Sequence, residues 1–123
     1  MARILVAEDE NAVREFVRRA LVHHGHEVTV ANDGAEALAM LAQSPVDLVL
    51  ADIRMPVMDG VALALKAARD YPAVTIMLMT GHASERDRAH DLRTLVEDIV
   101  LKPFSMAEIC NKVDAALARR SSR

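Results

Sequence analysis

The sequence contains very few aromatic residues and almost no cysteine. Among 123 residues there is no tryptophan, one tyrosine, two phenylalanines and one cysteine. A single cysteine cannot form an internal disulfide, and Cys110 lies in an apolar helical pattern, so we expect it to be a core residue. The chain also lacks a basic stripe with interleaved aromatic side chains. We therefore expect no direct binding to nucleic acid.

Long hydrophobic runs and an excess of one charge are also missing. No apolar stretch approaches the roughly 18 residues of a membrane span. The first residues contain no apolar signal core, and the formal net charge is only −3. We therefore expect a soluble, cytoplasmic protein that does not associate with a membrane. The length fits one domain, so residues 1–123 should form a single domain with no output domain.

Short apolar runs alternate with longer segments of helical period along the chain. This pattern is typical of an α/β protein with a doubly wound parallel sheet, and five strand-helix pairs can be counted. The third and fourth strands are almost continuously apolar and should be central. The predicted strands are residues 4–7, 27–30, 48–51, 74–79 and 98–101, and the predicted helices are residues 11–24, 34–43, 60–70, 84–93 and 105–119.

Several helix ends can be read from the residues at these boundaries. Asp33 precedes Glu36, and Ser105 precedes Glu108, at the spacing of N-terminal capping pairs. Gly25 is placed to end the first helix. The fourth helix has only two clearly apolar residues between 84 and 93, so we expect it to be weakly anchored and either simply exposed or a surface that moves.

Polar residues follow four of the predicted strands. Glu8 and Asp9 follow the first, Asp52 the third, Thr80 ends the fourth, and Lys102 ends the fifth. Ligands of open parallel sheets bind at the carboxyl ends of the strands, so these side chains should meet at one edge. Carboxylates about 4 Å apart repel by about 4 kcal/mol at an effective dielectric near 20. A cluster with only oxygen donors therefore predicts a hard cation such as Mg²⁺.

A carboxylate held by a metal and a lysine can attack phosphorus and form an aspartyl phosphate. Asp52 is the candidate nucleophile, because it follows a central strand. Phosphoryl transfer mainly requires alignment and neutralisation of the transferred oxygens. Mg²⁺ bound by Asp9 and Asp52, the Lys102 ammonium and the Thr80 hydroxyl could provide both.

These residues resemble a known family, the receiver domain of two-component signalling. The resemblance covers essentially the whole chain. It rests on Glu8-Asp9, on residues 48–60 (LVLADIRMPVMDG), on Thr80-Gly81 and on Lys102-Pro103. It implies a flavodoxin-like and CheY-like (βα)₅ fold with strand order 2-1-3-4-5.

The resemblance also implies a role for each site residue. Asp52 would be the phosphoacceptor, and Thr80 and Lys102 would bind the phosphoryl oxygens. Asp9, Asp52 and the backbone carbonyl of Arg54 would bind Mg²⁺, with Glu8 holding the metal through water. The bond between Lys102 and Pro103 would be cis.

The implied function is that of a stand-alone response regulator. A sensor histidine kinase or a histidine phosphotransfer protein would donate the phosphoryl group. The chain would catalyse only its own phosphorylation and dephosphorylation, so it would not be a turnover enzyme. The signal would pass to a protein partner through the fourth helix, the fifth strand and the fifth helix.

One position departs from the family pattern. Many receivers have Tyr or Phe three residues before the lysine, as a switch side chain that changes rotamer with the threonine, whereas this chain has Ile99. The missing aromatic, the opening residues 3–9 and the turn at residues 80–83 resemble the CpdR type of receiver. That type directs substrates to a ClpXP protease.

Other hypotheses remain open. The fold could serve as a constitutive interaction module without phosphorylation, although Glu8, Asp9, Asp52, Thr80 and Lys102 are all present. A flavodoxin-like cofactor binder would need a phosphate-binding loop where this chain has acidic residues 8–10. A hydrolase with a nucleophilic aspartate would need a second acid where Arg54 stands. His23, His24 and His26 cluster at the end of the first helix, far from the carboxylate edge, and should be surface residues. A metal site there would need further ligands, which the sequence does not suggest.

Overall fold

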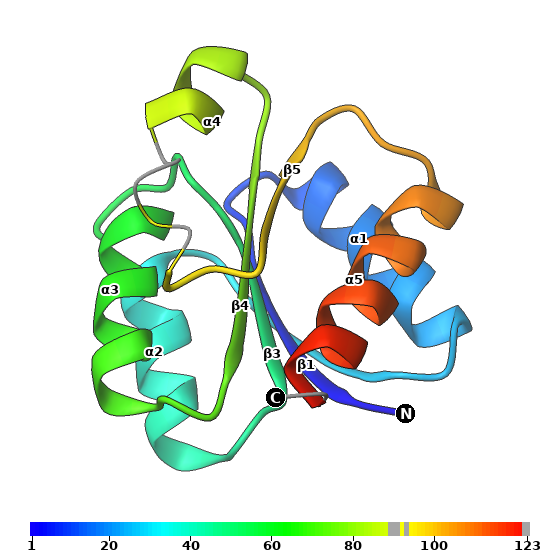
Figure 1. Ribbon diagram of the computed structural model, residues 1–123. Coiled ribbons are helices and arrows are strands. Elements are labelled where there is room, and N and C mark those ends of the chain that lie inside the picture. The colour runs from blue at the N-terminus through cyan, green and yellow to red at the C-terminus, as the bar shows by residue number, and fades with distance from the viewer. Residues whose placement is uncertain (89–91, 93, 122–123) are drawn as a thin grey trace.

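The computed structural model describes residues 1–88, 92 and 94–121, and within them five parallel strands form one sheet with helices on both faces (Figure 1). The order of strands is β2-β1-β3-β4-β5. All four neighbouring pairs are parallel. The predicted doubly wound α/β fold and strand order are confirmed. The strands are β1 (Arg3–Ala7), β2 (Glu27–Ala31), β3 (Leu48–Asp52), β4 (Thr75–Thr80) and β5 (Asp98–Leu101).

Two pairs of helices cover the two faces of the sheet. Helices α1 and α5 lie on one face, and α2 and α3 lie on the other (Figure 1). Their ends agree with the prediction to within two residues. In the part of the chain that the structure describes, no helix is long and apolar enough to span a membrane. The helices are α1 (Asn11–His23), α2 (Gly34–Gln43), α3 (Gly60–Asp70), α4 (Ala83–Arg88) and α5 (Met106–Ser121).

Helix α4 is shorter than predicted within the described residues. It begins at Ala83 and ends at Arg88, where the sequence predicts a helix over residues 84–93. The rest of that prediction falls mainly on residues 89–91 and 93, which lie outside the described residues. Residues 84–88 carry no apolar side chain, so this segment has little surface to bury against the sheet.

The core consists of two layers, one on each face of the sheet. Alternate residues of β1 belong to different layers: Ile4 packs with α1 and α5, and Leu5 packs with α2 and α3. Every residue of β3 and β4 is buried, which confirms that these strands are central. Burying one such apolar side chain contributes about 1.5–3 kcal/mol, so the two layers together stabilise the sheet whose carboxyl edge carries the polar residues.

The predicted helix ends are formed by local hydrogen bonds. Ser105 and Glu108 cap α5 reciprocally, because each side chain accepts from the other residue's backbone N–H. Gly25 ends α1 with a φ of 102°, in the left-handed region that favours glycine. Met106, the first residue of α5, is 46% exposed, and the apolar face of this helix is buried from Ile109 onward.

Close approach of backbone to backbone fixes the start of α3 against the end of β3. The N–H of Gly60 donates to the carbonyl of Ile53 at 2.9 Å. A Cβ atom at Gly60 would lie 2.2 Å from the backbone oxygen of Asp52. Only glycine fits this position, which lies directly beside the strand end that carries Asp52.

We therefore expect Gly60→Ala to lower the free energy of unfolding by about 2–3 kcal/mol, because the added methyl group overpacks a backbone contact. Urea unfolding followed by circular dichroism measures this change. Gly81→Ala is the matched control, since a Cβ there would meet nothing within 4 Å. Equal unfolding midpoints for the two variants would contradict the prediction.

Candidate functional site

Three carboxylates meet at the carboxyl edge of the sheet. Glu8 and Asp9 follow β1, and Asp52 ends the adjacent strand β3. Their nearest carboxylate oxygens all lie within 4.8 Å of one another. Glu8 is fully buried and Asp52 is 6% exposed, whereas Asp9 is exposed. The predicted cluster is therefore present, with two of its three acids inside the protein.

Lys102 supplies the positive charge at this edge. Its Nζ donates to Glu8 Oε1 at 2.7 Å and to Asp52 Oδ2 at 2.9 Å. The residue follows β5, and its backbone N–H donates to the carbonyl of Thr80 at 2.7 Å. The predicted cis bond between Lys102 and Pro103 is confirmed. The side chain passes the end of β4 and joins β1, β3 and β5 at one point.

The charges at this edge are not balanced by the lysine alone. Burial raises the pKa of Glu8 to about 7, the Lys102 hydrogen bond opposes this, and the charge of Asp52 adds to it. Burial lowers the pKa of Lys102, but its bonds to Glu8 and Asp52 outweigh that effect and the net pKa is raised. One ammonium thus faces three carboxylates whose donors are all oxygen, a set that fits a hard cation such as Mg²⁺.

Thr80 and Arg54 meet at a residue that the sequence analysis missed. The Thr80 hydroxyl donates to Glu85 Oε1 at 2.7 Å, and Arg54 Nε donates to Glu85 Oε2 at 2.5 Å. Glu85 belongs to α4 and is only 5% exposed. In the sequence it is one of several charges in a polar segment. Its spacing of five residues after Thr80 was the only feature of the sequence that could have indicated this contact.

This fold and acidic edge agree with the family comparison. Residues 4–114 match the response regulator receiver domain. The chain belongs to this family. Receiver domains are signalling domains of two-component systems. The receiver protein CpdR of Brucella abortus is 38% identical over 122 residues, a match that covers 95% of this chain and 98% of CpdR.

Two solved structures are similar to this receiver domain, and a further group of relatives is longer than it. The CheY-like receiver of Methanospirillum hungatei has a TM-score of 0.91 at 27% identity and covers 99% of this chain and 98% of its own. The regulator TrrA of Thermotoga maritima, solved in complex with Mg²⁺ and BeF, has a TM-score of 0.86 at 31% identity, over 94% and 99% of the two chains. The chain spans about half the length of the mycobacterial MprA regulators that it also matches.

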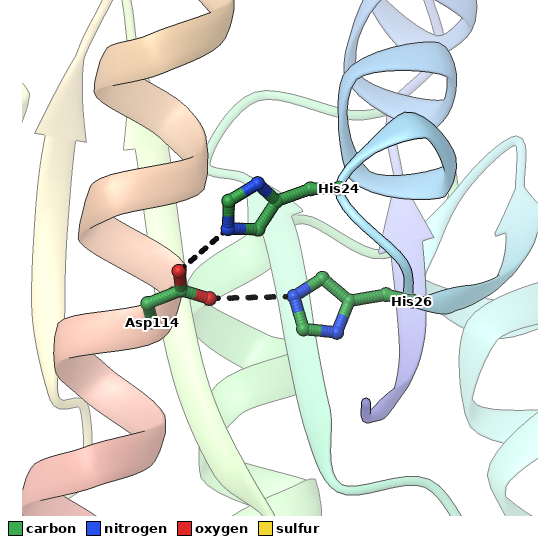
Figure 2. Close-up of side chains that lie close together, drawn as sticks. All are labelled: His24, His26 and Asp114. Atoms are coloured by element: carbon green, nitrogen blue, oxygen red, sulfur yellow. Dashed lines mark hydrogen bonds and ion pairs between the residues drawn. The ribbon is translucent and has the colours of Figure 1, made fainter.

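The structure also groups residues at the opposite edge of this receiver domain (Figure 2). The rings of His24 and His26, at the junction of α1 and β2, point toward Asp114 of α5. Their Nε2 atoms lie 2.6 Å and 3.4 Å from the Asp114 carboxylate oxygens. The expectation that all three histidines are surface residues is wrong for His26. Its side chain is only 7% exposed, because Asp114, distant in sequence, comes to lie beside it.

Two imidazoles and a carboxylate form a donor set that zinc can use. The backbone N–H of Ala2, however, donates to His26 Nδ1 at 3.0 Å and so occupies the lone pair of that nitrogen. The neutral His26 ring then carries its proton on Nε2, which faces Asp114 and has no lone pair for a metal. We therefore interpret the group as a hydrogen-bonded clamp that joins the residue before β1, the start of β2 and α5.

We expect Asp114→Ala to lower the free energy of unfolding by about 1–2 kcal/mol, because His26 would lose the acceptor that its buried Nε2 requires. Alanine favours the helix, so loss of helix propensity would not explain a decrease. His23→Ala provides the control, since His23 is exposed and lies outside the clamp. Chemical unfolding of the three proteins measures the difference, and an unchanged midpoint for Asp114→Ala would rule out a stabilising clamp.

Proposed function

We propose that this receiver domain accepts a phosphoryl group on Asp52 and thereby changes its affinity for a protein partner. The observation that carries the proposal is the contact of Lys102 Nζ with both Asp52 and Glu8, beside Asp9. This arrangement holds a carboxylate next to a fixed positive charge, which is what an aspartate needs in order to act as a nucleophile toward phosphorus.

The proposed donor is a phosphohistidine of a sensor kinase or of a phosphotransfer protein. An Asp52 carboxylate oxygen attacks the phosphorus, the bond between phosphorus and the histidine nitrogen breaks, and the imidazole leaves. Lys102 neutralises charge on the transferred oxygens, and the Thr80 hydroxyl donates a hydrogen bond to one of them. The domain thus promotes its own phosphorylation and dephosphorylation and does not turn over a separate substrate.

Mg²⁺ is part of this proposal. Asp9, Asp52 and the backbone carbonyl of Arg54 would hold the ion directly, and Glu8 would hold it through water. When bound, the ion supplies further neutralisation of the phosphoryl oxygens. The all-oxygen donor set supports this assignment, as does the similarity to TrrA, which was solved with Mg²⁺ and BeF.

The proposed output is a protein contact in the cytoplasm, as in the CpdR type, where it would direct substrates to a ClpXP protease. The 38% identity to CpdR over nearly its full length supports this role. The contact surface would be the face formed by α4, β5 and α5. Two large apolar side chains of these elements are exposed, Leu101 of β5 at 38% and Met106 of α5 at 46%.

Incubation with acetyl phosphate and Mg²⁺ tests the acceptor. We expect intact mass spectrometry to show the addition of one phosphoryl group to the wild type and none to Asp52→Asn. Asp70→Asn is the control, because Asp70 is an exposed aspartate at the end of α3 and should leave the addition intact. If the folded wild type gains no phosphoryl group, the constitutive interaction module becomes the better hypothesis.

Mg²⁺ binding is expected without phosphorylation. A ligand that binds only the folded state raises the unfolding temperature in proportion to the logarithm of its concentration once the site is saturated. Added Mg²⁺ should therefore raise the melting temperature of the wild type and of Asp70→Asn, and should have little effect on Asp9→Asn. Asp9 is exposed, so its substitution should leave the metal-free protein folded. Equal Mg²⁺ responses in all three proteins would exclude Asp9 as a ligand.

A further inference from the structure

The Thr80 hydroxyl already has a hydrogen-bond acceptor, and that acceptor belongs to α4. Thr80 Oγ1 donates to Glu85 Oε1 at 2.7 Å and accepts from the backbone N–H of His82 at 3.1 Å. Both side chains of the Thr80 and Glu85 pair are buried, at 1% and 5% exposed. The bond is therefore shielded from water, which would otherwise compete for either partner.

A hydroxyl group has only one proton to donate. While Thr80 donates it to Glu85, the same hydroxyl cannot donate to a phosphoryl oxygen on Asp52. The two acceptors, the Glu85 carboxylate and the phosphoryl group, are both anionic and form strong charge-assisted hydrogen bonds. They must therefore compete for one proton.

The Glu85 carboxylate is held by a cation, because Arg54 Nε donates to Glu85 Oε2 at 2.5 Å. Burial raises its pKa, but the hydrogen bonds from Arg54 and Thr80 outweigh burial, so the net pKa is lowered. The Arg54 side chain is 65% exposed, whereas Glu85 is almost fully covered. A rotation of Glu85 toward solvent could therefore keep the Arg54 contact after Thr80 is lost.

We propose that Glu85 is a positioning residue that competes with the phosphoryl group on Asp52 for the Thr80 proton. It thereby opposes phosphorylation. When the phosphoryl group takes the Thr80 proton, Glu85 is released from Thr80, and α4 changes with it. This inference rests on the proposed phosphorylation of Asp52. It also assigns a switch element to a chain in which Ile99 stands in place of the aromatic side chain, because the group that loses its contact with Thr80 is a carboxylate on α4.

Two substitutions of Glu85 separate the hydrogen bond from the charge. Glu85→Gln has the same size, but it loses the charge, and an NH2 group that cannot accept a hydrogen bond replaces one of the two oxygens that accept from Thr80 and Arg54. Glu85→Asp keeps the charge and is one methylene shorter, so it does not reach Thr80. Glu108→Gln is the matched control, an equal change in the first turn of α5.

The measured quantity is the acetyl phosphate concentration that gives half-maximal phosphorylation with saturating Mg²⁺. We expect this concentration to fall about three- to ten-fold in both Glu85 variants, because each lacks the hydrogen bond that Thr80 donates to the Glu85 carboxylate in the wild type. Glu108→Gln should match the wild type. An unchanged value in Glu85→Gln or in Glu85→Asp overturns the inference.

A double-mutant cycle shows whether Glu85 acts through Thr80. Beryllofluoride, a phosphoryl mimic, is titrated with Mg²⁺ against the wild type, Glu85→Gln, Thr80→Ala and the double variant. We expect Glu85→Gln to tighten binding in the wild-type background and to have no effect in the Thr80→Ala background. An equal gain in both backgrounds would mean that Glu85 acts only through its charge, and the inference would fail.

The proposed phosphorylation of Asp52 and the proposed role of Glu85 give different results when they fail. If the wild type takes up neither a phosphoryl group nor beryllofluoride, the proposed function fails and this inference falls with it. If the wild type is phosphorylated but the Glu85 variants behave like Glu108→Gln, only the role of Glu85 is overturned. Unfolding midpoints measured beside each titration show that every variant compared is folded.

Discussion

The double hydrogen bond of Lys102 is the contact on which the rest of the site depends. The parallel sheet brings the ends of β1 and β3 together, and with them the buried carboxylates of Glu8 and Asp52. Burying such charges without a partner costs several kcal/mol each. The ammonium, 2.7 Å and 2.9 Å from their oxygens, makes this burial tolerable and fixes the orientation of Asp52.

A second polar network lies beside the first and shares one strand end with it. The backbone carbonyl of Thr80 accepts from Lys102, and the Thr80 hydroxyl donates to Glu85. Thr80 therefore connects a network built on the central strands with one built on α4, of which the structure describes six residues. Elements with few buried contacts change position at low cost, so a change of partner at Thr80 affects α4 before it affects the sheet.

The rest of the fold resists such movement. The two core layers hold β3 and β4 from both faces, and Gly60 lets α3 start in backbone contact with Asp52. At the opposite edge, Asp114 joins α5 to the junction of α1 and β2 through His24 and His26 (Figure 2). Contacts between α1, β2 and α5 thus stabilise the edge opposite the site. The carboxyl edge carries the charged groups whose hydrogen-bond partners can change.

The fold and most of the site could be predicted from the residues alone, because apolar periodicity sets the elements and the carboxyl ends of parallel strands must meet at one edge. Glu8, Asp9, Asp52 and Lys102 could be placed together on that basis. The hydrogen-bond partners of individual side chains could not be predicted in this way. The contacts of Thr80 with Glu85, and of His26 with Asp114, depend on how a short helix and a terminal helix pack. Neither Glu85 nor Asp114 differs in sequence from an ordinary surface acid. Folding gives them their roles, because it buries Glu85 beside Thr80 and brings Asp114 next to His26, 88 residues away in the sequence.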